Sequence, residues 1–332
     1  MRALITGGCG FIGSALANRL VKEGDVIDII DDLSNGDPGN LECRFNAVPP
    51  ALLSRYPKKA KKGQALLITG DFACPEMLAR IGSGEYDVIY HLAANPRVSY
   101  SVEKPVESNE TNLHKSIAIF KTASDSKTRV VFSSSSAIYG NPQKLPTEED
   151  DMKSPESPYG LQKLLCEYYL DLFSKIYDMD VISLRYFNVY GPKAMGNSPY
   201  STAIAAWCNS IHDGLSLRSD GNGEQTRDMV YVDDIVEANY LAGRHIGSLN
   251  SEKINIATGE SCSNNHILDL LTKYVGKELD IVTAPERSGD VKHTRGCTKR
   301  AKNVLGYTTN MSLEEGLQKT VKWWSLLDDS RT

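Results

Sequence analysis

The chain has 332 residues, of which 41% are hydrophobic, and a formal net charge of −5. This length is enough for one large or two modest globular domains with a sizeable core. The mildly acidic balance argues against nucleic acid as the main partner, and no apolar stretch is long enough to span a membrane.

The predicted elements alternate along the first half of the chain. Short apolar runs with helical segments between them are typical of buried parallel strands whose sheet is covered by helices on both faces. These strands are predicted at residues 2–6, 25–31, 65–71, 86–94, 128–136 and 180–187. The segment 44–64 shows no clear periodicity and contains Pro49-Pro50, so we expect it to leave the sheet.

After about residue 188 the alternation of strands and helices becomes less regular, and loops that contain glycine and proline appear. Further helices are predicted near residues 203–212, 233–244, 264–274 and 313–327. We therefore predict an α/β protein in which a Rossmann-like, doubly wound parallel sheet is joined to a smaller, mixed α/β C-terminal domain. The expected division assigns residues 1–187 and 228–258 to cofactor binding, and residues 188–227 and 259–332 to substrate binding.

A glycine-rich turn follows the first predicted strand and opens a predicted helix over residues 14–23. Gly7, Gly10 and Gly13 let such a turn tighten and let the backbone approach a pyrophosphate at the positive end of the helix. Asp31 ends the second strand, where a carboxylate can accept a hydrogen bond from an adenosine ribose. A carboxylate there also repels a 2′-phosphate, so the pattern predicts NAD as the cofactor rather than NADP.

Three later strands also end in residues suited to a binding site. Asp71 and Phe72 could flank an adenine, and the small residues of the segment 91–94 would admit a cofactor. The residues 133–136 are all serines, at the end of the fifth strand. Hydroxyl groups at this edge of a sheet can hydrogen-bond a substrate hydroxyl and relay its proton.

The stretch SPYGLQK places Tyr159 and Lys163 one turn apart on the same face of a predicted helix. A free tyrosine has a pKa of about 10, so acting as a base near pH 7 needs a shift of roughly 3 units, or about 4 kcal/mol. One lysine supplies only part of this stabilisation. We therefore expect a bound cationic cofactor to supply the rest.

The motif TGGCGFIG, the serine run and the YxxxK motif occur in an order that resembles the extended short-chain dehydrogenase/reductase family. The resemblance is specific to its nucleotide-sugar epimerases and dehydratases, and it runs nearly end to end. It includes RYFNVYGP (185–192), GNGEQTRDMVYVDDI (221–235) and RSGDVKHT (287–294).

The resemblance implies a role for each matching residue. Tyr159 is the expected base, Lys163 its electrostatic partner and ribose anchor, and Ser135 the hydroxyl partner; oxidised nicotinamide would be the missing cation. The expected cofactor-binding residues are Gly7, Gly10, Phe11, Ile12, Gly13, Asp31, Asn35, Asp71, Phe72, Leu92, Ala93, Ala94, Asn112, Ser133, Tyr159, Lys163 and Tyr186. The expected substrate-binding residues are Ser135, Asn188, Arg227, Arg287, Asp290 and Thr294. The two arginines suit a pyrophosphate, and a carboxylate suits ribose hydroxyls.

The predicted reaction depends on the two residues that follow Ser135 in the chain. Dehydratases of this group carry Asp-Glu there, whereas this chain has Ser136 and Ala137. Without an acid and a base for eliminating water, a 4-keto sugar can turn over in the pocket and take the hydride back on its other face. We therefore predict a 4-epimerase that keeps NAD bound.

The expected substrate is a UDP-sugar. The segments 196–207 and 290–296 resemble the bacterial subgroup that acts on UDP-N-acetylhexosamines. Thr294 stands where the family gates the sugar pocket, and a small gate leaves room for an N-acetyl group at C2. The expected pair is UDP-GlcNAc and UDP-GalNAc, with UDP-glucose and UDP-galactose as further candidates.

Two alternatives stay open. Some UDP-glucuronate 4-epimerases also carry a small gate, and Arg97 or the serines at 99 and 101 could meet the sugar carboxylate. A noncatalytic, NAD-sensing scaffold is the alternative from a different class, because a fold does not by itself guarantee a function. The presence of the whole reactive set argues against the scaffold.

Cysteine usage and helix patterns bear on location and assembly. The seven cysteines are odd in number and include no CxxC pair, and the six histidines form no metal-ligand pattern. Together with the lack of a signal peptide, this favours the cytoplasm. Wide apolar stripes on the predicted helices near 106–124 and 159–177 favour a homodimer.

Overall fold

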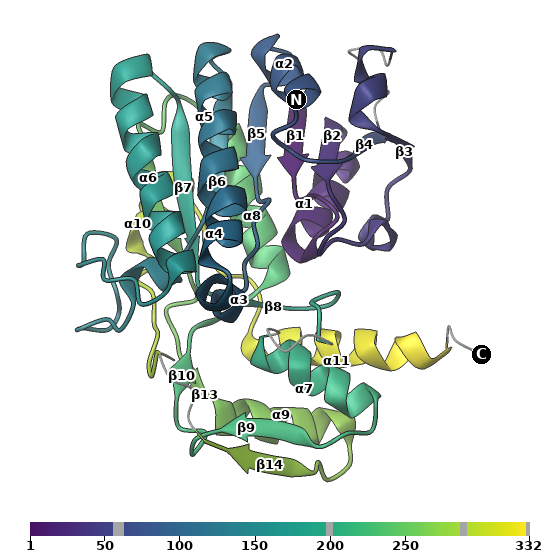
Figure 1. The fold of residues 1–332 in the computed structure, drawn as a ribbon. Coiled ribbons are helices and arrows are strands. Elements are labelled where there is room, and N and C mark those ends of the chain that lie inside the picture. Colours follow the sequence, from purple (N-terminus) through teal and green to yellow (C-terminus); the bar gives the residue numbers. More distant parts are fainter. Residues whose placement is uncertain (56–62, 197–201, 286–290, 330–332) are drawn as a thin grey trace.

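The computed structural model describes residues 1–55, 63–196, 202–285 and 291–329. Its centre is a parallel eight-stranded sheet in the order β12-β7-β6-β5-β1-β2-β4-β3 (Figure 1). The strands are β1 (Arg2–Thr6), β2 (Val26–Asp31), β3 (Phe45–Val48), β4 (Ala65–Thr69), β5 (Val88–His91), β6 (Arg129–Ser135), β7 (Val181–Tyr186) and β12 (Glu252–Ile256). The strand order reverses between β1 and β5, and ligands bind at such switch points in doubly wound sheets.

Helices cover both faces of this sheet. They are α1 (Phe11–Lys22), α8 (Val232–Arg244) and α10 (Lys299–Leu305) on one face, and α2 (Pro75–Gly82), α5 (Lys115–Asp125) and α6 (Pro158–Tyr177) on the other. Successive residues of β1 alternate between the two cores: Ala3 and Ile5 pack in the first, and Leu4 in the second. The six predicted strands and the doubly wound fold class are confirmed.

A smaller part lies beyond the carboxyl ends of the strands (Figure 1). Its elements are α7 (Ala203–His212), α9 (Asn264–Val275), α11 (Leu313–Asp329) and three strand pairs: β8 (Asn188–Tyr190) with β11 (Met229–Tyr231), β9 (Leu217–Asp220) with β14 (Ile281–Ala284), and β10 (Thr226–Arg227) with β13 (Cys262–Ser263). The four helices predicted after residue 188 all form and begin within one residue of the expected position. Within the described ranges, no helix is long and apolar enough to cross a membrane.

The expectation that residues 44–64 leave the sheet is wrong for part of that segment. Phe45–Val48 forms β3, an edge strand that pairs parallel with β4. Four residues are too few to show a clear periodicity, and an edge strand needs only one partner. The short 3-10 helix η2 (Pro50–Arg55) follows, and the basic stretch 56–62 lies outside the described residues.

The helix predicted near 106–124 is interrupted. Its place is taken by α4 (Pro105–Asn109), the π-helical turn η3 (Glu110–His114) and α5, and the short α3 (Val98–Glu103) precedes them. π-helical turns are often found at functional sites. Here the turn contains Asn112, one of the predicted cofactor-binding residues.

Candidate active site

The turn between β1 and α1 is tight because its glycines allow contacts that a side chain would block. Gly7 has a φ of +71°, and a Cβ there would lie 2.8 Å from the Cα of Ala93. A Cβ on Gly13 would lie 2.1 Å from the carbonyl oxygen of Gly7. Gly10 stands at the N-cap of α1 and has no side chain to cover the first N–H groups of the helix. The turn therefore offers a close backbone approach and a partial positive charge, which together suit a pyrophosphate.

Gly13→Ala is expected to lower the NAD content of the purified protein by about tenfold or more. The new methyl group has to displace the Gly7 carbonyl, and overpacking of this kind costs roughly 1–3 kcal/mol. The NAD released on denaturation gives the measurement. Gly82→Ala is the control, because a Cβ there meets only the Thr122 side chain at 3.5 Å. An equal NAD content in both variants would contradict the assigned role of the turn.

Asp31 holds the glycine turn in place. Its carboxylate is 7% exposed and accepts hydrogen bonds from the N–H groups of Cys9 (2.8 Å) and Leu33 (2.9 Å). Burial raises the pKa of Asp31, whereas these N–H groups lower it. Asn35 lies in the loop that follows. The carboxylate thus stands at the end of β2, where a ribose contact is expected, and fits an NAD molecule whose pyrophosphate lies on the turn.

The other predicted cofactor residues lie along the same edge of the sheet. Asp71 forms an ion pair with Lys115 (2.7 Å), and Phe72 packs edge-on against the buried His91 with ring centroids 5.3 Å apart. Leu92, Ala93 and Ala94 follow β5, next to Gly7. The segment that they begin is held by hydrogen bonds to the next residue, Asn95.

Asn112 makes these hydrogen bonds. Its side-chain oxygen accepts from the Asn95 N–H (2.7 Å), and its amide nitrogen donates to the Asn95 carbonyl (3.0 Å). The same amide donates to Gln162 of α6 (2.9 Å), which also accepts from Ser108 (2.9 Å). These side chains are buried. The network ties the loop after β5 to the helix that carries Tyr159.

Ser135 and Tyr159 are brought together by a close approach of α6 to the end of β6. Ser135 accepts from the N–H of Ala137 (3.2 Å) and caps the 3-10 turn η4 (Ser136–Tyr139). A Cβ on Gly160 would lie 2.6 Å from the Ala137 carbonyl oxygen, so glycine permits this approach. Tyr159 lies in the first turn of α6, where the positive end of the helix dipole favours a phenolate.

The contact of Ser101 with Tyr159 was not predicted from the sequence. The hydroxyl of Ser101 accepts the Tyr159 N–H at 3.1 Å and donates to the Val98 carbonyl at 2.6 Å. Ser101 is fully buried on α3, far from Tyr159 in the chain. The sequence pointed to this serine only as a candidate for meeting a sugar carboxylate.

Lys163 lies one helical turn after Tyr159 in α6 and is 3% exposed. Its Nζ donates to the Ser133 carbonyl (2.7 Å) and lies 5.9 Å from the centroid of the Tyr159 ring. Burial lowers the pKa of Lys163 to about 8. Burial also raises the pKa of Tyr159 to about 12, although a hydrogen bond with Ser135 acts in the opposite direction. Burial thus favours the protonated phenol, and a further positive charge nearby would lower its pKa.

Tyr186 and the predicted substrate residues lie where the two parts of the molecule meet. Tyr186 ends β7, and its hydroxyl is bonded to the side chain of Asn239. Asn188 donates to the hydroxyl of Thr294 at 3.1 Å, so the structure brings these two together. Arg227 donates to the carbonyl of Lys292 (3.1 Å), two residues before Thr294 in the chain. The two remaining predicted substrate residues, Arg287 and Asp290, lie outside the described residues.

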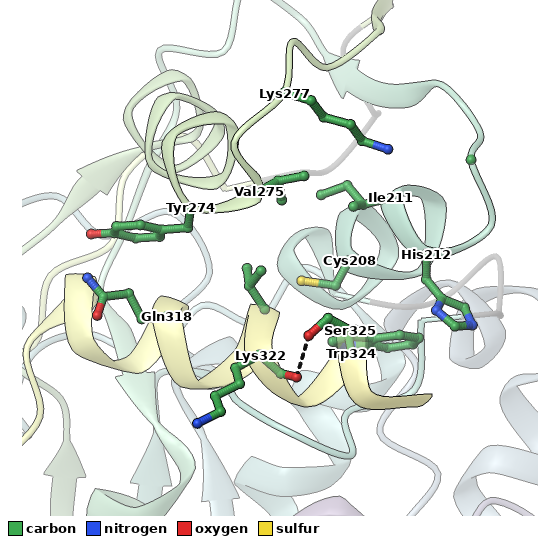
Figure 2. Close-up of a pocket in the computed structure, with 12 residues that line it drawn as sticks. Cys208, Ile211, His212, Tyr274, Val275, Lys277, Gln318, Lys322, Trp324 and Ser325 are labelled. Atoms are coloured by element: carbon green, nitrogen blue, oxygen red, sulfur yellow. Dashed lines mark hydrogen bonds between the residues drawn. The ribbon is translucent and has the colours of Figure 1, made fainter. Parts of the chain in front are cut away.

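A separate cavity of about 620 Å³ lies between α7, α9 and α11 (Figure 2). Its lining includes Cys208, Ile211, His212, Tyr274, Val321 and Trp324. None of the predicted site residues that the structure describes lines it. The cavity therefore does not contribute to the site assembled above.

Comparison with known proteins agrees with this geometry. The family described as "NAD dependent epimerase/dehydratase family" matches residues 3–257. A UDP-glucose 4-epimerase of Mycolicibacterium smegmatis is 31% identical over 328 residues and is matched over 98% of both chains. The crystal structure of a Thermotoga maritima UDP-glucose 4-epimerase with UDP-glucose has 34% identity and a TM-score of 0.88, and the match covers 98% of this chain and 99% of that one.

A second solved structure is similar to the same extent. It is a UDP-N-acetylglucosamine 4-epimerase from Methanobrevibacter ruminantium M1 in complex with UDP-N-acetylmuramic acid, with 32% identity, a TM-score of 0.86 and 98% of both chains covered. The family match spans more than half of the chain, and the fold and the glycine turn agree with it. This chain is therefore an enzyme of the NAD-dependent epimerase/dehydratase family, with NAD as its cofactor.

Proposed function

We propose that the protein is a UDP-sugar 4-epimerase. The observation that carries the proposal is the assembly of Ser135, Tyr159 and Lys163 at the carboxyl end of β6, on the same edge of the sheet as the glycine turn. Ser136 and Ala137, which start η4, offer no acid or base for eliminating water. The similar UDP-sugar 4-epimerases support the same reaction.

The residues have distinct tasks in this reaction. NAD, when bound, would supply a hydride acceptor and donor for C4 of the sugar, and its oxidised nicotinamide would supply a positive charge. Tyr159 takes the proton of the 4-hydroxyl and gives it back, and Ser135 orients that hydroxyl. Lys163, held by the Ser133 carbonyl, favours the phenolate electrostatically.

We further propose that residues 1–187 and 228–258 hold NAD, and residues 188–227 and 259–332 hold the nucleotide sugar. All eight strands of the main sheet come from the first set. A cytoplasmic location is supported by the seven cysteines, which are all free thiols.

For the sugar, we propose UDP-GlcNAc and UDP-GalNAc, with UDP-glucose and UDP-galactose as further substrates. The hydroxyl of Thr294 accepts hydrogen bonds from Asn188 and from the N–H of Asp228, both at 3.1 Å, so a small side chain is fixed at the gate. UDP-glucuronate is the rival substrate. Ser101, one candidate for binding its carboxylate, is fully buried and already bonded to Val98 and Tyr159, which argues against that role.

Product analysis tests the reaction and the sugar. The pure enzyme is incubated separately with UDP-GlcNAc, UDP-glucose and UDP-glucuronate, and the products are identified by NMR. Interconversion at C4, fastest for UDP-GlcNAc, is the expected result. Fastest turnover of UDP-glucuronate would favour the rival, and a 4-keto-6-deoxy product would refute the epimerase.

Thr294→Tyr is expected to lower kcat/KM for the N-acetylated pair by about tenfold or more relative to UDP-glucose, because the larger side chain fills the space at C2. Thr294→Ser keeps the hydroxyl and its two hydrogen bonds, so it is the control. The two pairs of sugars are assayed with each variant. Equal losses on both pairs would contradict the gate.

We also propose a homodimer that forms through α6. Leu161, Tyr168, Leu172 and Ile176 are each about half exposed, and their spacing places them on one face of the helix. An exposed apolar stripe of this kind is typical of an interaction surface. Sedimentation should show a dimer at micromolar concentration, and Leu172→Glu with Ile176→Glu should shift it to monomer. A wild-type monomer under these conditions would contradict the proposal.

A further inference from the structure

Asp228 joins β10 to β11 and is fully buried. Its Oδ1 accepts hydrogen bonds from the N–H (2.8 Å) and the hydroxyl (2.7 Å) of Thr258. Its Oδ2 accepts from the N–H groups of Gly259 (3.1 Å) and Gly296 (3.0 Å). Burial raises the pKa of this carboxyl, and the four donors lower it. One carboxylate thus connects three segments that are far apart in the sequence.

The peptide groups of Asp228 contact two predicted substrate residues directly. Its N–H donates to the hydroxyl of Thr294 at 3.1 Å. Its carbonyl accepts both from the backbone N–H and from the side-chain amide of Asn188, each at 3.1 Å. The side chain of Asn188 also donates a hydrogen bond to the hydroxyl of Thr294. A shift of Asp228 would therefore move both residues.

Other hydrogen bonds also hold the segment that carries Thr294, to Thr226, Arg227 and Thr147. Backbone hydrogen bonds join Thr294 to Thr226 (3.0 Å), and join Arg295 and Cys297 to Thr147 (2.7 and 2.8 Å). Between them, Gly296 is held by the carboxylate of Asp228. A buried carboxylate needs all of its donors in place, so it tolerates little displacement of the groups around it.

We propose that Asp228 is a positioning residue that sets the affinity of the nucleotide-sugar site by fixing Thr294 and Asn188. The proposal rests on the proposed function. Asp228 acts through these two side chains and is not itself a catalytic residue. It was not predicted from the sequence, because its partners at Thr258 and Gly296 are distant in the chain.

Asp228→Asn is the decisive variant. In either orientation, the new amide NH₂ faces at least one backbone N–H donor where an oxygen had accepted it. We expect the KM for the preferred UDP-sugar and the Kd for UDP to rise about tenfold, which corresponds to roughly 1.4 kcal/mol. The kcat and the NAD content should stay close to the wild-type values, since Tyr159 and the glycine turn are held by other contacts.

Asp234→Asn is the matched control. Asp234 is also buried (3% exposed), and its carboxylate accepts from the backbone N–H groups of Asn310 (2.9 Å) and Met311 (3.3 Å). Neither of these contacts involves Thr294 or Asn188. The control should lose stability without a change in KM or in the Kd for UDP.

The outcomes separate this inference from the proposed function. An unchanged KM and Kd in Asp228→Asn, or an equal rise in both variants, would overturn the inference. If Asp228→Asn does not fold, Thr258→Val removes one of the four donors and should raise the Kd for UDP about threefold; an unchanged Kd would overturn the inference. A wild-type protein that binds UDP but converts no UDP-sugar would defeat the proposed function alone, and the calorimetric Kd values would still test Asp228. A wild-type protein that does not bind UDP would overturn both.

Discussion

Tyr159→Phe is expected to lower kcat by about 10² to 10⁴-fold, the usual contribution of a general base. The substitution removes only the hydroxyl, and the ring keeps its buried place at the start of α6. NAD content and the Kd for UDP should therefore stay at wild-type values. Turnover, released NAD and calorimetry on the same preparation give the three measurements.

The control for this variant is Tyr169→Phe. Tyr169 lies on the same helix and is 37% exposed, so loss of its hydroxyl should change neither turnover nor NAD content. A Tyr159→Phe protein that turns over sugar at the wild-type rate would exclude Tyr159 as the base. A wild-type protein that binds NAD but converts no sugar, with Tyr159→Phe indistinguishable from it, would favour the noncatalytic scaffold.

The main fold could be predicted because its signals are local. Each central strand is mostly apolar and buried on both faces, and each is separated from the next by a helix or loop. β3 was missed because an edge strand of four residues, half of them exposed, does not have that signal. The π-helical turn at Glu110–His114 was also missed, since propensity alone does not distinguish it from a continuous α-helix.

In the candidate site, too, the residues with a local sequence signal could be predicted and the others could not. Gly7, Gly13, Tyr159 and Lys163 could be predicted, because their chemistry depends on neighbours within a few positions along the chain. Asp228 could not be predicted, because its role comes from segments that meet only in the folded protein. The direction of the two pKa shifts at Tyr159 and Lys163 was likewise not available from spacing, since both depend on burial.

Lys163→Met is expected to stabilise the dinucleotide-free protein at neutral pH while lowering its activity. Folding places Lys163 in a buried site and lowers its pKa from 10.5 to about 8, so the protonated form is disfavoured in the folded state. This cost is complete below pH 8 and disappears as the pH rises through 10.5, where the lysine is neutral in both states. The difference between the two pKa values corresponds to roughly 3 kcal/mol at pH 7.

Urea unfolding of wild type and Lys163→Met, both stripped of NAD, gives the measurement. The advantage of the variant in free energy of unfolding should fall by roughly 2 kcal/mol between pH 7 and pH 9.5. Lys175→Met is the control, because Lys175 is exposed in the last turn of α6 and should show no such trend. If the advantage of the variant stays constant over this range, folding does not lower the pKa of Lys163.

The activity of the same variant should change in the opposite direction. Without the ammonium group, the phenol of Tyr159 loses a favourable charge 5.9 Å from its ring, so its pKa rises further and the rising limb of the pH–rate profile moves to higher pH. An active site that stores a destabilising charge in this way exchanges stability for function. A variant that gains stability but keeps the wild-type pH–rate profile would show that the lysine is buried without acting on the base.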